Sequence, residues 1–183
     1  MRKVTATDAA TNYLVGLLTD YAKPGGLAEE TLDRPLAFLL DEALHAEAPG
    51  ERFDRLRTLG DGVLYGCGFF GEHFAARGVE QRYLIGIGTT AYDNAGSMLR
   101  RGSSPEDKTL ASVDIFAELA TKFAVYVEVL ADVAESTMAM GSASSKSVVK
   151  LYERWLKTGS DRLAEALSAH GLVPTRGSGG VIQ

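Results

Sequence analysis

The sequence contains the pattern Gly-x-Gly-x-x-Gly at residues 66–71 and a second pair of glycines at Gly86 and Gly88. Such a pattern can turn a strand into a helix and hold a dinucleotide pyrophosphate at the helix N-terminus. That site also requires a strand before the glycines and an acid about 20 residues after them. Residues 61–65 make a poor strand, and the acid nearest to that distance, Asp93, follows the second glycine pair in a helical segment. The sequence therefore argues against a dinucleotide site.

The same glycines lie on stripes of helical spacing. One stripe, in steps of three and four, contains Phe53, Leu56, Gly60, Val63, Cys67, Phe70 and Phe74. Because this phase continues through residue 66, we predict a glycine-rich helix over residues 51–77. Each glycine costs a helix about 0.8–1.0 kcal/mol relative to alanine, so close packing must offset the loss. The small-x-x-x-small spacings Gly62/Gly66 and Gly86/Thr90 predict a tightly packed pair of glycine-rich helices.

A flat ligand lying against the glycines is the alternative hypothesis. His73 shares a stripe with Gly62, Gly66 and Phe69, and could bond a molecule held in that groove. Leu59-Gly60-Asp61 followed by glycines resembles the distal helix of haem oxygenases, where backbone glycine lies over the macrocycle. Those enzymes take their haem ligand from a histidine near the N-terminus, and this sequence has none before His45, so we carry over no activity. The candidate ligand-binding residues are Gly62, Gly66, Gly68, Phe69, His73, Gly86 and Gly88.

Other patterns that could support chemistry have better structural explanations. Glu42 and His45 form one Glu-x-x-His unit, but a di-iron bundle needs two, and these residues lie opposite the apolar face of their segment. Residues 141–147 resemble a Walker A loop but follow a helix rather than a strand. Cys67 and His73 are about 240° apart around a helix and cannot pair within it. We therefore predict no catalytic residue, no metal and no cofactor, and expect that the protein is not an enzyme.

The elements that carry these residues read as six helical segments separated by glycine, proline and serine. The first carries Ala10, Leu14, Leu17 and Tyr21 at helical spacing, and the second follows Asp33 and Pro35. The sixth runs from about Ser145 to His170, with Gly171 as its C-terminal stop, and residues 159–161 can kink or restart it. We predict an all-α, single-domain bundle of five or six helices over residues 1–173, followed by a disordered tail over 174–183.

The fifth segment predicts a long central helix over about residues 105–138. Two stripes continue through it without a break, and one of them is rich in small residues. A partner helix, internal or from a second chain, can pack closely on such a stripe. The candidate interface residues are Ala117, Ala120, Ala124, Val127, Ala131 and Ala134.

Composition limits the partners. The net charge is −5, and the modest basic cluster of Lys146, Lys150, Arg154 and Lys157 recurs at helical spacing, so we expect a solvated face and no nucleic-acid partner. No segment approaches a membrane span, no signal peptide is evident, and the single cysteine fits a reducing compartment. We expect a cytoplasmic, bacterial helical protein acting through protein–protein contacts as a homodimer. The alternative is a sensor or accessory protein holding a flat apolar molecule, for example a tetrapyrrole.

Overall fold

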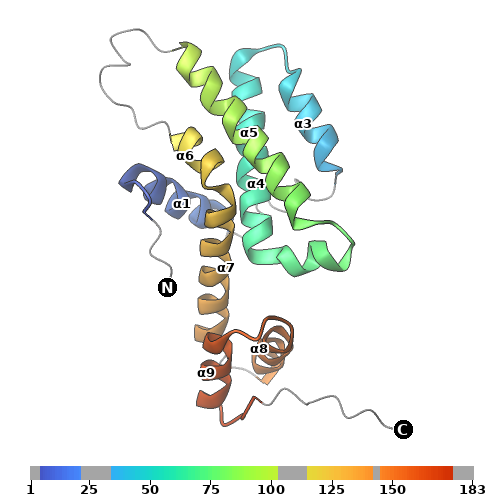
Figure 1. Ribbon diagram of the computed structural model, residues 1–183, viewed down its shortest axis with the longest axis vertical. Helices are drawn as coiled ribbons and strands as arrows, with labels where there is room; N and C mark the ends of the chain where they lie inside the picture. Colours follow the sequence, from blue (N-terminus) through green and yellow to red (C-terminus); the bar gives the residue numbers. More distant parts are fainter. Residues whose placement is uncertain (1–4, 22–33, 103–114, 142–144, 175–183) are drawn as a thin grey trace. The chain divides into compact units, whose positions relative to one another are not determined.

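The computed structural model describes residues 5–21, 34–102, 115–141 and 145–174 (Figure 1). Within these residues the protein is all-helical, and no strand is present, so the predicted fold class is confirmed. The helices are α1 (Asp8–Tyr21), α3 (Leu36–Leu44), α4 (Pro49–Ala76), α5 (Gln81–Gly102), α6 (Ile115–Thr121), α7 (Phe123–Met140), α8 (Ser145–Thr158) and α9 (Asp161–Ala169).

The glycine-rich segment is a helix, as its unbroken apolar phase predicted. α4 begins at Pro49, a residue suited to the first helical turn, and ends before Gly78, whose φ is +75°. It is distorted at Phe70, where φ is −125° and ψ is 21°. The Gly-x-Gly-x-x-Gly pattern therefore lies within this helix, and the dinucleotide hypothesis is excluded for it.

Eight helices are described, against the five or six predicted, because two predicted segments are each divided. The sixth segment divides into α8 and α9 at Gly159, whose φ of +65° ends a helix. The fifth divides into α6 and α7 at Lys122, although backbone hydrogen bonds continue through this residue, from Lys122 N to Glu118 O and from Tyr126 N to Lys122 O. The long central helix is therefore present from Ile115 to Met140 with one interruption, and its predicted start at 105–114 lies outside the described residues.

The chain divides into two compact units, Met1–Leu130 and Ala131–Gln183. In the first unit α5 packs on α4, α6 and α3, while α1 packs on α4 and α6. Figure 1 shows α3, α4 and α5 side by side. The largest fully buried side chains of this unit are Tyr92, Tyr126, Phe123, Leu56, Leu64, Leu84, Leu119 and Leu130.

The second unit contains the end of α7 together with α8 and α9, which pack on each other. Its core is small, with Leu151 and Trp155 from α8 and Leu163 and Leu167 from α9 fully enclosed. The single domain over residues 1–173 stays a prediction. Asp33, which precedes the second predicted segment, and the tail after Pro174 lie outside the described residues.

Candidate functional site

A carboxylate is buried in the glycine-rich stretch of α4. Asp61 is 7% exposed and is the one buried acidic or basic residue among those described. Its Oδ1 accepts hydrogen bonds from the hydroxyls of Tyr13 on α1, at 2.6 Å, and Tyr92 on α5, at 2.7 Å. Its Oδ2 lies 3.9 Å from the Arg57 guanidinium, one turn earlier on α4. Three helices therefore meet at one side chain.

Burial dominates the electrostatics of this cluster. It raises the pKa of Asp61, although the hydrogen bonds from Tyr13 and Tyr92 and the charge of Arg57 act in the opposite direction. Burial and the neighbouring carboxylate also raise the pKa of both tyrosines, which keeps their hydroxyls protonated as donors. The cluster is enclosed by the helices that form it, so its arrangement serves to hold α1, α4 and α5 together.

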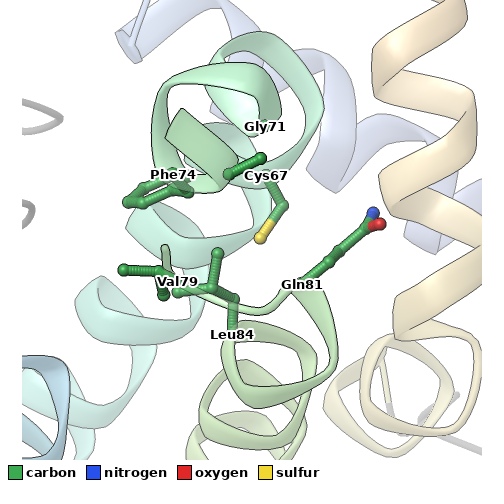
Figure 2. A pocket seen from close by; sticks show the side chains of 7 residues that line it. Cys67, Gly71, Phe74, Val79, Gln81 and Leu84 are labelled. Carbon is green, nitrogen blue, oxygen red and sulfur yellow. The ribbon is translucent and has the colours of Figure 1, made fainter. Parts of the chain in front are cut away.

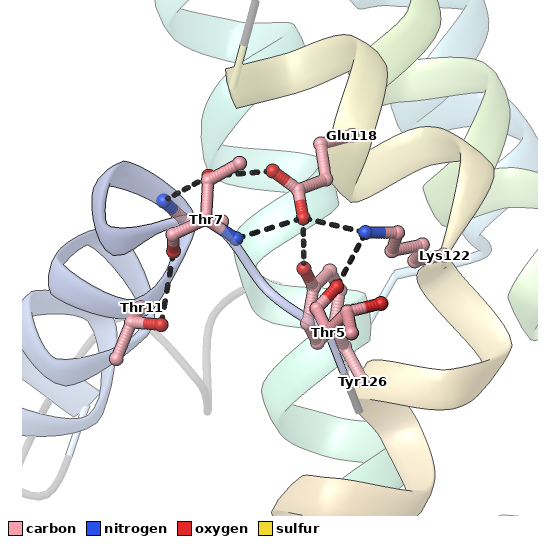
Figure 3. Close-up of polar contacts among 7 residues, drawn as sticks. Thr5, Thr7, Thr11, Glu118, Lys122 and Tyr126 are labelled. Carbon is pink, nitrogen blue, oxygen red and sulfur yellow. Dashed lines mark hydrogen bonds and ion pairs between the residues drawn. The ribbon is translucent and has the colours of Figure 1, made fainter. Parts of the chain in front are cut away.

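A second carboxylate, Glu118 on α6, fixes the start of α1 (Figure 3). It accepts bonds from the backbone N–H and hydroxyl of Thr7, at 3.2 and 2.6 Å, from Lys122 Nζ at 2.8 Å and from the Tyr126 hydroxyl at 2.9 Å. Lys122 also donates to the Thr5 carbonyl. Burial disfavours the charged form of Glu118, but these bonds outweigh it and lower its pKa to about 2. The sequence patterns assigned no role to either carboxylate, although Asp61 is part of the Leu59-Gly60-Asp61 resemblance.

Three glycines explain how helices approach one another in the first unit. A Cβ at Gly60 would lie 2.6 Å from the ring of Tyr92, so this glycine admits α5 beside Asp61. A Cβ at Gly68 would overlap Leu130, and one at Gly88 would overlap the ring of Phe123. The glycines at 68 and 88 therefore make room for α7, a partner that the sequence did not indicate for them.

The remaining predicted ligand residues do not form one surface. Gly62 and Gly66 are buried, Phe69 is half-buried and stacks on Tyr65 with ring centroids 4.6 Å apart, and Gly86 and His73 are exposed. Since side chains of α7 fill the space at the other two glycines, the geometry does not favour a flat molecule lying along this stripe.

The residues weighed for metal or nucleophilic chemistry are also separated. Glu42 pairs with Arg34 at 2.6 Å on an exposed surface, and the His45 ring lies 2.9 Å from the Asp41 carbonyl. Cys67 is buried whereas His73 is exposed. Among the described residues, no group of three or more histidine, cysteine or acidic side chains could hold a metal.

The alanine stripe proposed as an interface is largely covered. Ala120, Val127 and Ala134 are buried, and Ala117 and Ala131 are half-buried. Only Ala124 among the six candidates is exposed. Most of these side chains are therefore covered within this chain.

Exposed apolar side chains lie on α8. Leu151 and Trp155 point into the core of the second unit, but Val149 and Leu156 are 57% and 48% exposed. Tyr152, between them, is half-buried: it packs against that core, and its ring centroid lies 5.7 Å from that of Trp155. These three residues, the α8 strip, follow one another at helical spacing and lie on one side of the helix.

Charged residues border the α8 strip. Lys150, Glu153 and Lys157 are exposed along one edge of the helix. The α8 sequence contains four basic residues and one acid. An apolar strip with a charged edge is typical of a helix that docks through anchors at i, i+3 and i+7, so the strip is the candidate functional site.

Comparisons with protein-family models, with curated proteins and with solved structures find no match to this chain. Among the described helices, none is both long and apolar enough to cross a bilayer.

Proposed function

We propose that the protein acts through protein–protein contacts and that its principal contact is a homodimer formed by the α8 strip. The observation that carries this proposal is the exposure of Val149 and Leu156 on a helix whose other apolar residues, Leu151 and Trp155, already belong to a core. Single exposed apolar residues are normal on the surface of a soluble protein and need no explanation. A row of exposed apolar residues at helical spacing is instead typical of a helix that docks into a partner.

A second copy is the occupant that the strip fits best. In an antiparallel pairing about a two-fold axis near Tyr152, Val149 faces Leu156 of the partner subunit, and the reverse contact forms by symmetry. The same axis brings Glu153 beside Lys150 and Lys157 of the partner subunit, so the charged edges attract. The strip is therefore complementary to itself in both apolar and charged character.

The contact area sets the expected strength. Three partly exposed side chains from each copy bury far less than the roughly 800 Å² per partner of a standard interface. We therefore expect a weak dimer, with a Kd on the order of 10–100 µM.

In this proposal the first unit is the rigid body, with glycine-rich α4 and α5 packed tightly together. The lone buried thiol of Cys67 suits a bacterial cytoplasm.

Sedimentation equilibrium of the full chain over about 5–500 µM tests the dimer. Val149→Glu and Leu156→Glu each place a charge in the apolar contact between Val149 of one copy and Leu156 of the other, and each should raise the Kd at least tenfold. The matched control is Val15→Glu on α1, because Val15 is 58% exposed against 57% for Val149. The control should dimerise like the wild type.

Two results would overturn the proposal. One is a wild-type chain that stays monomeric to the highest concentration. The other is a dimer whose Kd is unchanged by either strip substitution, which would assign association to another surface. Circular dichroism of each variant confirms that the helices remain folded.

A further inference from the structure

A cavity of about 110 Å³ lies where α4 turns into α5 (Figure 2). Cys67 and Phe74 from α4, Val79 from the connection and Leu84 from α5 line it. Figure 2 shows the Cys67 sulfur directed toward Leu84, between the two helices; Gln81 also lines the cavity, and the amide end of its side chain lies away from these apolar groups. The cavity belongs to the first unit and is separate from the α8 strip.

Local backbone features account for the empty space. α4 is distorted at Phe70, immediately before Gly71, which also lines the cavity. A Cβ at Gly71 would meet no atom within 4 Å, so the glycine leaves room that no neighbour fills. Two residues after the helix end, Gly78 turns the chain with a φ of +75° and sends Val79 back over the opening.

The lining determines which molecules the cavity suits. Its walls are mostly carbon, and the Cys67 thiol, 4% exposed, forms no hydrogen bond with another described residue. Burial raises the pKa of this thiol to about 12, so it is neutral at pH 7. A charged ligand would lose its hydration here without a counter-charge. A neutral apolar molecule would gain contacts that the walls now lack.

We propose that this cavity binds a small, uncharged, apolar molecule, with the Cys67 thiol as part of its wall. An apolar cavity of about 150 Å³ accepts benzene or xenon, so the present volume suits xenon or a hydrocarbon of about four or five carbons. A tetrapyrrole requires several times this space, since sites for drug-sized ligands occupy about 300–1,000 Å³. The flat ligand of the alternative hypothesis does not fit this cavity, which suits a much smaller molecule.

Xenon is the direct probe, applied to the full chain and followed by methyl NMR. In the wild type, xenon should shift the methyl signals of Val79 and Leu84, while those of Leu163 in the second unit stay fixed. Cys67→Leu fills the cavity and should reduce the shifts at least fivefold. Cys67→Ala enlarges it and should retain or increase them.

The absence of xenon-induced shifts at Val79 and Leu84 in the wild type would overturn the proposal, as would equal shifts in Cys67→Leu. If Cys67→Leu does not fold, Gly71→Leu provides a second way to fill the space. Its matched control is Gly86→Leu on α5, where a Cβ also meets no atom within 4 Å. Loss of the shifts in Gly71→Leu alone supports the cavity site, whereas equal shifts in both contradict it.

Discussion

Asp61 places a carboxylate in the core of the first unit, where two phenol hydroxyls donate to the same oxygen. Asp61→Ala removes that acceptor and leaves the fully buried Tyr92 hydroxyl without it. An unsatisfied buried donor costs about 1–3 kcal/mol. We therefore expect the free energy of unfolding to fall by about that amount, as measured by urea denaturation at pH 7.

Asp61→Asn is the matched control because an amide oxygen can still accept both bonds. It should cost at least about 1 kcal/mol less than Asp61→Ala. The pKa of Asp61 is raised in the folded state, so folding binds a proton between its unfolded and folded pKa values. The stability of the wild type relative to Asp61→Asn should therefore rise as the pH falls through that interval. Equal costs for the two substitutions at pH 7 would show that the tyrosines do not depend on this acceptor.

Glu118 has the opposite dependence on pH. Its folded pKa is about 2, below the ordinary value near 4.3, so its ionised form stabilises the folded state. That contribution is present above about pH 4.5 and is lost as the pH falls toward 2. Urea denaturation of the wild type and Glu118→Gln at pH 5, 4 and 3 should show their stability difference shrinking. A difference that stays constant would mean that Thr7, Lys122 and Tyr126 do not stabilise the charged carboxylate.

At the scale of elements, the glycines of α4 and α5 are of two kinds: some allow a neighbouring helix to pack closely, and others face open space. A Cβ at Gly68 would overlap Leu130 and lie 3.3 Å from its carbonyl carbon, so Gly68→Ala forces α7 to shift. We expect a net loss of about 1–3 kcal/mol by thermal or urea unfolding. Gly86→Ala meets open space and should instead add up to about 1 kcal/mol. A stabilising effect of both substitutions would contradict the close approach at Gly68.

The helices themselves could be predicted because their signals are local. Ala10, Leu14, Leu17 and Tyr21 are all buried as their spacing predicted, and Gly159 divides the last segment where a restart was expected. The packing partners could not be predicted in the same way. Glycine spacing shows that something approaches a helix, but nothing in it indicated that Phe123 and Leu130 would fill the space.

The same limit applied to the candidate site. Asp61 reads in the sequence as one polar residue among glycines, because its partners Tyr13 and Tyr92 are 48 and 31 positions away. The alanine stripe correctly indicated a helix, but periodicity marks a face without showing whether that face is covered within the chain or by a second chain. The α8 strip became visible only once Leu151 and Trp155 had been placed in the core.

For the molecule as a whole, the important feature is two separate cores of unequal size. The core cluster of the second unit consists, among the described residues, of Leu151, Trp155, Leu163 and Leu167, with other apolar side chains partly buried around them. A unit of this size has little stability in reserve. Leu163→Ala removes a fully buried side chain, and such cavities cost about 2–5 kcal/mol. That loss is comparable to what a small helical core supplies in total.

Hydrogen exchange on the intact protein shows which helices are destabilised by Leu163→Ala. In Leu163→Ala the amides of α8 and α9 should lose most of their protection, because their own core no longer holds them together. The amides around Leu64 in α4 should keep theirs, since the core of the first unit contains none of the four residues. The dimer should weaken in parallel, because the α8 strip requires a folded α8. Loss of protection throughout α4 and α5 would show instead that the two cores unfold as one cooperative structure.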